Sequence, residues 1–396
     1  MPTTQTLIFL DADLFVAQIL IRFLLIALFA FLAADVSAVE TVRFNRQNQP
    51  QTVAGRLILK AADGGLLIQA NDGRIWTLQP EEIVSHTSDA KPFVPLKAAE
   101  VARQVQRELG NGFSVHTTVN YVLVYNTTKT YAQWVGGLLE RLQDGFEAYW
   151  KKLGFKITDP EFPLVVLVFD CVESYSRYTK QDLQGDPRTV VAYYNQASNR
   201  VSLYDLTGVE ALRQPGNQRG STAQINTMLS QPEAQLMVAT IIHEATHQLA
   251  YNSGLQQRFA DVPIWFSEGM AVYFETPDLS TVKGWRTIGE INRLRLSRYR
   301  EHLPQKPRDS LSTLAINNER FLRPRDSLDA YAEAWALTHY LLKAKPQAYV
   351  AYLQKLSAKP PFVWDEPEER LKEFRDVFGD PKELDAELNK YIGQLK

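Results

Sequence analysis

The sequence predicts an α+β protein in which a small β unit precedes a mixed α/β region and a mostly helical C-terminal part. Three observations support this prediction. Short apolar stretches between 53 and 78 are separated by Asp-Gly and Asp-Gly-Gly turns, which is typical of a β-meander. Strand-like and helical periodicities alternate between 113 and 232. From 233 to the C-terminus, apolar residues recur mostly at helical spacing.

The composition is that of an ordinary globular protein. The chain has 396 residues, of which 45% are apolar and 22% are charged, and this length suffices for two or three domains with a sizeable core. A formal net charge of −2 provides no electrostatic footprint for nucleic acid. The single cysteine, Cys171, excludes an internal disulfide framework.

Residues 1–38 are predicted to form a signal peptide. The twelve residues 23–34 are apolar, a length typical of the hydrophobic region of such a signal, and Val-Ser-Ala at 36–38 fits a cleavage site. The alternative is an uncleaved membrane anchor over 14–34, although Arg22 weakens this segment as a spanning helix. Both interpretations place the rest of the chain outside the cytoplasm, in the periplasm, the cell envelope or the extracellular medium. Only the anchor would attach the protein to a membrane.

The β unit is predicted to occupy 39–88 and to have the size of an SH3-like barrel. Its predicted strands are 53–60, 66–70 and 74–78. Two roles are open for it. It could bind a partner or the cell wall, or it could pack against the following domain, which is the role we favour. A linker at 91–95 and a helix at 96–109 are expected within the connecting segment 89–112.

The next region, 113–232, is predicted to be an α+β subdomain. It combines a strand rich in Val, Tyr and Thr, an amphipathic helix, a continuous apolar run typical of a buried strand, and a hairpin. In chain order these elements are 114–125, 130–152, 163–169, 190–194 and 200–204. The remaining residues, 233–396, are predicted to form a helical subdomain, with further helices at 285–303 and 328–342.

A metal-binding pattern lies in the first helix of the C-terminal part. His243 and His247 are four residues apart, so both side chains lie on one face of a helix and can hold a Zn²⁺ together. Glu244 then projects towards the open coordination position, where water binds. Glu268, in a second helix, completes a His₂Glu set, the open geometry of a catalytic zinc site. The competing interpretation, a core helix with two satisfied histidines, requires partners for a buried Glu244.

The flanks of the pattern indicate where its helix begins and ends. Ser230 and Glu233 fit a capping box at the start, and Gly254 is a stop signal. Asp261 precedes the second helix, where we expect it either to cap that helix or to orient a ligand histidine. Capping is the interpretation that we favour.

The His-Glu-x-x-His pattern at 243–247 and the run Trp-Phe-Ser-Glu-Gly-Met-Ala-Val-Tyr-Phe-Glu at 265–275 resemble the gluzincin metallopeptidases. Ser-Glu-Gly-Met-Ala is similar to the Asn-Glu-Gly-Phe-Ala helix of aminopeptidase-N-like enzymes. A more specific resemblance, from about 113 to the C-terminus, is to an uncharacterised bacterial family of peptidase-MA-like proteins, a domain of unknown function. The resemblance implies a gluzincin-type fold and one Zn²⁺ per chain, held by the two histidines and Glu268, with water activated by Glu244.

The resemblance also concerns two other regions. In aminopeptidase-N-like enzymes a Tyr at the start of a helix stabilises the anionic tetrahedral intermediate, and Tyr331, 63 residues beyond Glu268, is the corresponding candidate. A core aromatic residue is an equally weighted interpretation of Tyr331, and His339 is a weaker donor candidate. In gluzincins the edge strand of the sheet lines the cleft. We therefore expect the hairpin near Tyr194 and Asn195 either to bind extended substrate by β-addition or to be an ordinary hairpin.

The sequence departs from the family pattern at two places, which bear on the expected substrate and on the residues expected to orient the histidines. The Gly-x-Met-Glu-Asn segment with which aminopeptidase-N-like enzymes read a free amino terminus is absent from the strand region. Endopeptidase action or another amide substrate is therefore favoured. The thermolysin-type Glu-x-x-x-Asp pattern is also absent, because Val272 stands four residues after Glu268. No residue is thus predicted from that pattern to orient the ligand histidines.

The function predicted from the sequence is an exported zinc metallopeptidase that acts on a peptide or protein substrate. Glu244 is the predicted general base and Tyr331 the predicted oxyanion donor. The alternative is a non-catalytic envelope protein, or pseudo-peptidase, with a structural zinc site and a partner-binding β unit. Glu244 argues against this alternative, because a structural zinc site needs no general base.

Overall fold

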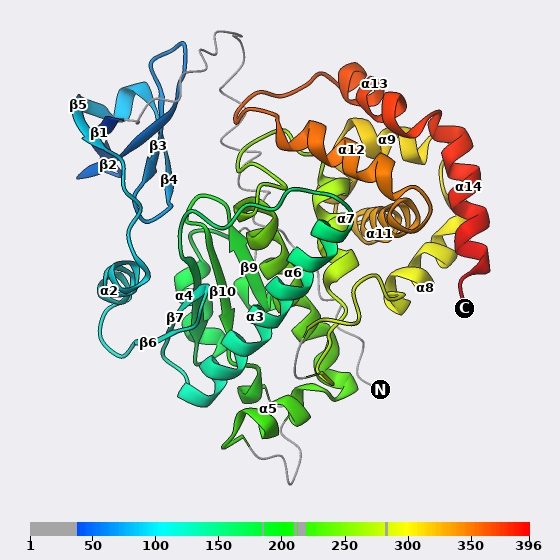
Figure 1. Cartoon of the computed structure of the whole chain (residues 1–396), viewed down its shortest axis with the longest axis horizontal. Coiled ribbons are helices and arrows are strands. Elements are labelled where there is room, and N and C mark those ends of the chain that lie inside the picture. The colour runs from blue at the N-terminus through cyan, green and yellow to red at the C-terminus, as the bar shows by residue number, and fades with distance from the viewer. Residues whose placement is uncertain (1–37, 184–185, 210–211, 213–218, 282–283) are drawn as a thin grey trace.

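The protein has the predicted α+β architecture (Figure 1), and the computed structural model describes residues 38–183, 186–209, 212, 219–281 and 284–396. An N-terminal antiparallel sheet is followed by a second sheet flanked by helices and then by a helical C-terminal part. The predicted signal peptide lies outside the described residues except for Ala38. Among the described residues, no helix combines the length and the apolar character needed to cross a membrane.

The N-terminal β unit is a five-stranded antiparallel sheet in the order β4-β3-β2-β1-β5. Its strands are β1 (Ala38–Arg46), β2 (Gln49–Lys60), β3 (Leu66–Ala70), β4 (Ile75–Leu78) and β5 (Ile83–Pro92). Val42, Phe44 and Ile68 are buried at its centre. The three predicted strands are present, and β1 and β5 are additional. β5 is exposed and mostly polar, so it has no apolar periodicity, and it extends into the segment predicted as a linker.

The second sheet is mixed and has the order β6-β7-β8-β10-β9. Its strands are β6 (Ser114–Thr117), β7 (Tyr121–Tyr125), β8 (Leu164–Phe169), β9 (Ala192–Asn195) and β10 (Arg200–Tyr204). β7, β8 and β10 run parallel, and β6 and β9 pair antiparallel at the two edges. The single strand predicted over 114–125 is wrong. The segment is a hairpin, because the chain reverses at Val119 and the N–H of Thr118 bonds to the carbonyl of Tyr121. The predicted hairpin of β9 and β10 is confirmed.

Helices cover both faces of the second sheet. They include α2 (Ala98–Leu109), α3 (Lys129–Lys152), α4 (Val172–Thr179) and α6 (Pro232–Asn252). Adjacent residues of a strand point to opposite faces of the sheet. In β9, Tyr193 packs edge-on against Tyr175 of α4, whereas Tyr194 stacks on Tyr251 of α6. α4 and α6 therefore lie on opposite faces, and edge strand β9 lies between them.

The C-terminal part is built around α6, α7 and α11, which are buried along most of their length. α8, α9, α12, α13 and α14 lie around α11, on the side away from the second sheet (Figure 1). The bounds are α5 (Thr222–Leu229), α7 (Ile264–Phe274), α8 (Arg293–His302), α9 (Ser310–Ile316), α10 (Glu319–Leu322), α11 (Ser327–Ala344), α12 (Pro346–Ser357), α13 (Pro367–Phe378) and α14 (Pro381–Gln394).

Two predicted helix starts are wrong. The capping box at Ser230 is not formed, because Ser230 ends α5, where its hydroxyl donates to the carbonyl of Asn226, and α6 begins after Gln231. The helix predicted over 285–303 begins only at Arg293, where the side chain of Asn292 caps α8. The predicted stop of α6 is confirmed, with Gly254 at a φ of 83°.

Candidate metal centre

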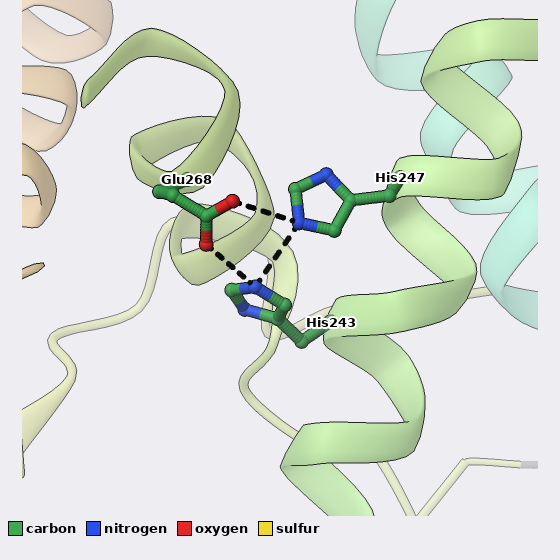
Figure 2. A group of neighbouring side chains, drawn as sticks. All are labelled: His243, His247 and Glu268. Atoms are coloured by element: carbon green, nitrogen blue, oxygen red, sulfur yellow. Dashed lines mark hydrogen bonds and ion pairs between the residues drawn. The ribbon is translucent and has the colours of Figure 1, made fainter. Parts of the chain in front are cut away.

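Two buried helices bring the predicted metal ligands together. His243 and His247 project from α6, and Glu268 reaches them from α7, as Figure 2 shows. The two Nε2 atoms are 3.2 Å apart. Glu268 Oε2 lies 3.0 Å from His243 Nε2, and Glu268 Oε1 lies 3.2 Å from His247 Nε2. The donor atoms of three residues therefore face one another across one small space.

These separations suit a divalent cation such as zinc. Zn–N and Zn–O bonds of about 2.0–2.2 Å place neighbouring donor atoms of a tetrahedron about 3.3–3.6 Å apart. The three separations of 3.0–3.2 Å are only slightly shorter than that edge. Two imidazole nitrogens and one carboxylate are also the donor set of open catalytic zinc sites. The three residues could thus hold a metal ion, as the sequence predicts.

The second ring nitrogen of each histidine is held by its own partner. Glu275 Oε2 lies 2.9 Å from His243 Nδ1, and because an ionised carboxylate only accepts, His243 Nδ1 carries the proton. Ser267 Oγ lies 3.3 Å from His247 Nδ1 and donates its own proton to Gln256 Oε1, so it accepts from that nitrogen. When the rings are neutral, both histidines are then protonated at Nδ1, and the lone pairs of both Nε2 atoms point into the shared space. This is the tautomer that a metal ligand requires.

The centre is rich in buried negative charge. Glu244, Glu268 and Glu275 are each at most 4% exposed. Arg295 Nε, 3.9 Å from Glu275, offsets one of these charges. Among the described residues, the carboxylate of Glu268 forms ion pairs with the two histidines alone, which carry no permanent charge. Buried negative charge is costly unless it is neutralised, and a divalent cation between the three donors would offset it.

The same contacts shift the pKa values of the site. Burial raises the pKa of Glu244 to about 7, although the neighbouring His243 and His247 oppose this shift. Burial also opposes ionisation of Glu268, but the charge of His247 and the hydrogen bond with His243 outweigh it and hold the pKa of Glu268 well below its usual range. Burial lowers the pKa of His243, yet its bonds to Glu268 and Glu275 outweigh burial and raise it. A metal ion and protons therefore compete for the same atoms.

Glu244 is separate from the ligand group. Its Oε2 accepts a hydrogen bond of 2.8 Å from the backbone N–H of Tyr194 in edge strand β9. This is the partner that a buried Glu244 requires. The sheet thus fixes the carboxylate that the sequence predicts as the general base, while the two helices fix the ligands.

Tyr331 lies in the second turn of α11, not at the start of the helix as expected. It is buried, and its ring contacts the guanidinium of Arg295 at 5.2 Å and the ring of Phe321 at 5.3 Å. Arg295 also approaches Glu275, which holds His243. Tyr331 is therefore linked to the centre through two intervening residues, and its role as oxyanion donor stays a prediction.

His339, the weaker donor candidate, is engaged away from the centre. Its Nε2 faces the carbonyl oxygen of Gly289 at 3.2 Å, and its Nδ1 faces the hydroxyl of Tyr391 at 2.9 Å. Burial, together with the charge of Lys343, lowers its pKa to about 4. A neutral ring that donates from Nε2 and accepts at Nδ1 satisfies both contacts.

Both expectations for Asp261 are wrong. Its carboxylate is paired with Arg370 of α13 and accepts a hydrogen bond of 3.0 Å from the N–H of Asp365. The N-cap of α7 is Pro263, without a side-chain hydrogen bond, and both ligand histidines have other partners. Asp261 instead ties the loop before α7 to the C-terminal helices.

The residues that orient the histidines were the ones that sequence reasoning missed. Glu275 is the C-cap of α7 and stands seven residues, or two helical turns, after Glu268, so both carboxylates lie on the same side of the helix. The thermolysin-type spacing directs attention to the position four residues on, which is Val272. A search of the whole helix face for a carboxylate would have found Glu275, whereas nothing in the sequence singles out Ser267.

The segment that carries the centre matches a known family. Residues 237–363 match the family described as a protein of unknown function (DUF1570). The matched segment contains His243, Glu244, His247, Glu268 and Tyr331. The predicted resemblance to a domain of unknown function is therefore confirmed over this segment. No curated protein matches the chain.

Proposed function

We propose that this protein is a zinc-dependent hydrolase that cleaves peptide bonds and uses Glu244 as its general base. The observation that carries the proposal is the position of Glu244. Its carboxylate is buried beside the ligand group, takes no part in that group, and is held by the N–H of Tyr194. A purely structural metal site has no use for such a group.

In the proposed hydrolysis, the metal ion and the residues around it have separate roles. When bound, Zn²⁺ supplies a Lewis acid that lowers the pKa of a coordinated water to about 7. Glu244 accepts the proton of the attacking water and passes it to the leaving amine. Burial raises the pKa of Glu244, which makes its carboxylate a stronger proton acceptor than an exposed glutamate. Tyr331 is the proposed donor to the oxyanion of the intermediate.

Edge strand β9 is the proposed site for an extended substrate. In the part of the chain that the structure describes, one side of β9 has no neighbouring strand, and Tyr194 of β9 bonds to Glu244. A peptide added along this side would lie beside the general base. We also retain export as part of the proposal, since residues 1–38 are predicted from the sequence to be a signal peptide.

The test is a peptide-library cleavage assay on the full chain, with and without a chelator, combined with metal analysis. We expect cleavage that the chelator abolishes and about one zinc ion per chain. Glu244→Gln should keep its zinc and lose at least about 10²-fold in kcat, because the general base is removed while the ligands remain. Zinc without any cleavage would instead favour a non-catalytic envelope protein, and a fully active Glu244→Gln variant would refute the role of Glu244.

A further inference from the structure

The N-terminal β unit meets the second sheet at a junction beside the turn between β9 and β10. The N–H of Ile75 in β4 donates to the carbonyl of Ala197 in that turn at 2.7 Å. Arg258, in the loop between α6 and α7, donates to the carbonyl of Gln196 at 3.0 Å and to the carbonyl of Gly73 at 2.8 Å. One side chain thus joins the β unit to the hairpin that contains β9.

Arg258 is built into this junction. Its side chain is buried, and a buried guanidinium is costly unless it is hydrogen-bonded. Gly73 has a φ of 87°, and a Cβ at this position would lie 2.9 Å from the ring of Phe162, so the turn that presents its carbonyl requires glycine. Phe259 follows Arg258 and packs with Leu67 and Ile75 of the β unit in a small apolar cluster.

The same hairpin leads to Glu244. Gln196 Oε1 accepts from the N–H of Phe259 at 3.1 Å, and Gln196 Nε2 donates to the hydroxyl of Tyr251 at 3.1 Å. The ring of Tyr251 stacks on that of Tyr194, with 5.7 Å between centroids. Tyr194 provides the N–H that holds Glu244. A continuous series of contacts therefore runs from the β unit to the proposed general base.

We propose that Arg258 is a positioning residue that clamps the N-terminal β unit onto the β9–β10 hairpin and so keeps β9 in place against Glu244. The N-terminal β unit then stabilises the position of the β9–β10 hairpin and is not a module that binds a partner. The effect of the clamp on catalysis rests on the proposed hydrolase function, whereas its effect on β9 does not.

Hydrogen exchange of the full chain tests the clamp directly. Arg258→Met removes both hydrogen bonds but keeps much of the side-chain volume. Peptides that cover 70–76 and 192–197 should exchange at least about tenfold faster, while α3 and β8 keep their protection. The zinc content should stay the same, because the ligands belong to α6 and α7. A folded variant in which 192–197 exchanges as in the wild type would overturn the proposal, as would equal acceleration of every segment.

Arg141→Met is the matched control. Arg141 also donates to two backbone carbonyls, those of Asp278 and Thr281, each at 2.9 Å. These contacts join α3 to the loop after α7 and do not involve the β unit. This variant should leave the exchange of 70–76 and 192–197 unchanged, so acceleration there equal to that of Arg258→Met would refute a specific clamp.

Two further variants approach the clamp independently. In Gly73→Ala, the added methyl group clashes with Phe162 and strains the turn of the β unit that contacts Arg258. Hydrogen exchange in 192–197 should therefore also become faster. Unchanged exchange in this segment would contradict the proposal that the β unit holds β9 in place. Arg258→Lys keeps a cationic donor and should restore part of the protection that Arg258→Met loses; no recovery at all would contradict the hydrogen-bonding role.

Kinetics provide a second measurement. Displacement of β9 should lower kcat of Arg258→Met about 10–100-fold at unchanged zinc content, with part of the loss restored by Arg258→Lys. An unchanged kcat in Arg258→Met would overturn the positioning role. If the wild type cleaves no peptide, the hydrolase proposal fails by itself, and the exchange of 192–197 still decides whether Arg258 clamps β9.

Discussion

Two buried clusters of histidine and carboxylate groups lie in the helical part, and they differ in the source of their positive charge. In the Glu333 cluster, the fully buried Glu333 meets Arg320 and His302 through Oε1 and the hydroxyl of Ser310 through Oε2. In the candidate metal centre, the equally buried Glu268 is paired, within the described part of the chain, with two histidines and with no arginine or lysine.

The difference shows how a metal centre can be told from a structural ion pair. Arg320 brings a permanent charge to Glu333, so that cluster is complete without an external ion. At the metal centre, Glu275 and Ser267 occupy the Nδ1 atoms of the histidines, and the Nε2 atoms converge with Glu268 on one point. Converging lone pairs are unfavourable until a cation lies between them.

The largest effect on stability is expected from breaking the Glu333 cluster. Glu333→Leu leaves the half-buried Arg320 and His302 without their shared carboxylate, which should lower the free energy of unfolding by about 3–5 kcal/mol. Urea titration monitored by circular dichroism measures this loss. Zinc content should be unaffected. A loss below about 1 kcal/mol would mean that the cluster is not a paired, desolvated network.

Removal of the metal should have the next largest effect. At a free zinc concentration about a thousandfold above Kd, a chelator should lower the free energy of unfolding by about 4 kcal/mol, because the proposed zinc ion would bind only the folded state. His247→Ala, which removes a ligand, should unfold identically with and without the chelator. Insensitivity of the wild type to the chelator would place the metal centre in the same class as the Glu333 cluster.

Acid should weaken the Glu333 cluster in a defined window. Burial opposes ionisation of Glu333, but its bonds with His302 and Arg320 outweigh burial and lower its pKa from 4.5 to about 2. Because the folded-state pKa is depressed, the contribution of Glu333 is fully present above pH ~4.5 and is lost as pH falls towards ~2. A shift of this size corresponds to about 3 kcal/mol.

The measurement compares the wild type with Glu333→Gln, both in chelator so that the metal centre does not contribute. The difference between their free energies of unfolding should be constant above pH ~4.5 and should shrink below it. A difference that stays constant down to pH ~2 would show that Glu333 does not titrate in this network.

The sequence predicted the candidate metal ligands better than it predicted their surroundings, for a physical reason. His243, Glu244 and His247 lie within two turns of one helix, so helical periodicity alone fixes their relation. Glu268 could be predicted as the third candidate ligand because its neighbours in the sequence resemble the Asn-Glu-Gly-Phe-Ala helix of aminopeptidase-N-like enzymes. The partners Glu275 and Ser267 depend on how α7 is rotated against α6, and α7 is so apolar that its sequence reveals no preferred face.

In the fold, too, features with a local sequence signal were predicted and features that depend on tertiary contacts were not. The strands β3 and β8 are short, mostly apolar runs and are predicted closely, whereas the exposed and mostly polar β5 has no such signal. Asp261 precedes a helix, so capping was the natural local expectation. Its partner, Arg370, is more than 100 residues away, and only the tertiary structure brings the two together.

The smallest of these effects is expected at the partners of the histidines, and it tests whether the metal centre is tuned by charge. Glu275→Ala removes the carboxylate on His243 Nδ1 and should weaken zinc binding about 10–100-fold, or roughly 1.4–2.7 kcal/mol. Ser267→Ala removes a longer, neutral contact to His247 and should have a smaller effect. Competition with a chromogenic chelator measures both affinities.

Glu333→Gln is the control for the last comparison, since Glu333 lies in the other cluster and its variant should bind zinc as the wild type does. Equal affinities for Glu275→Ala, Ser267→Ala and the wild type would show that the Nδ1 partners only pack against the rings. A larger loss for Ser267→Ala than for Glu275→Ala would reverse the proposed order. The expected order follows from the charge of Glu275, which stabilises the imidazole more strongly than a hydroxyl does and makes it a better ligand.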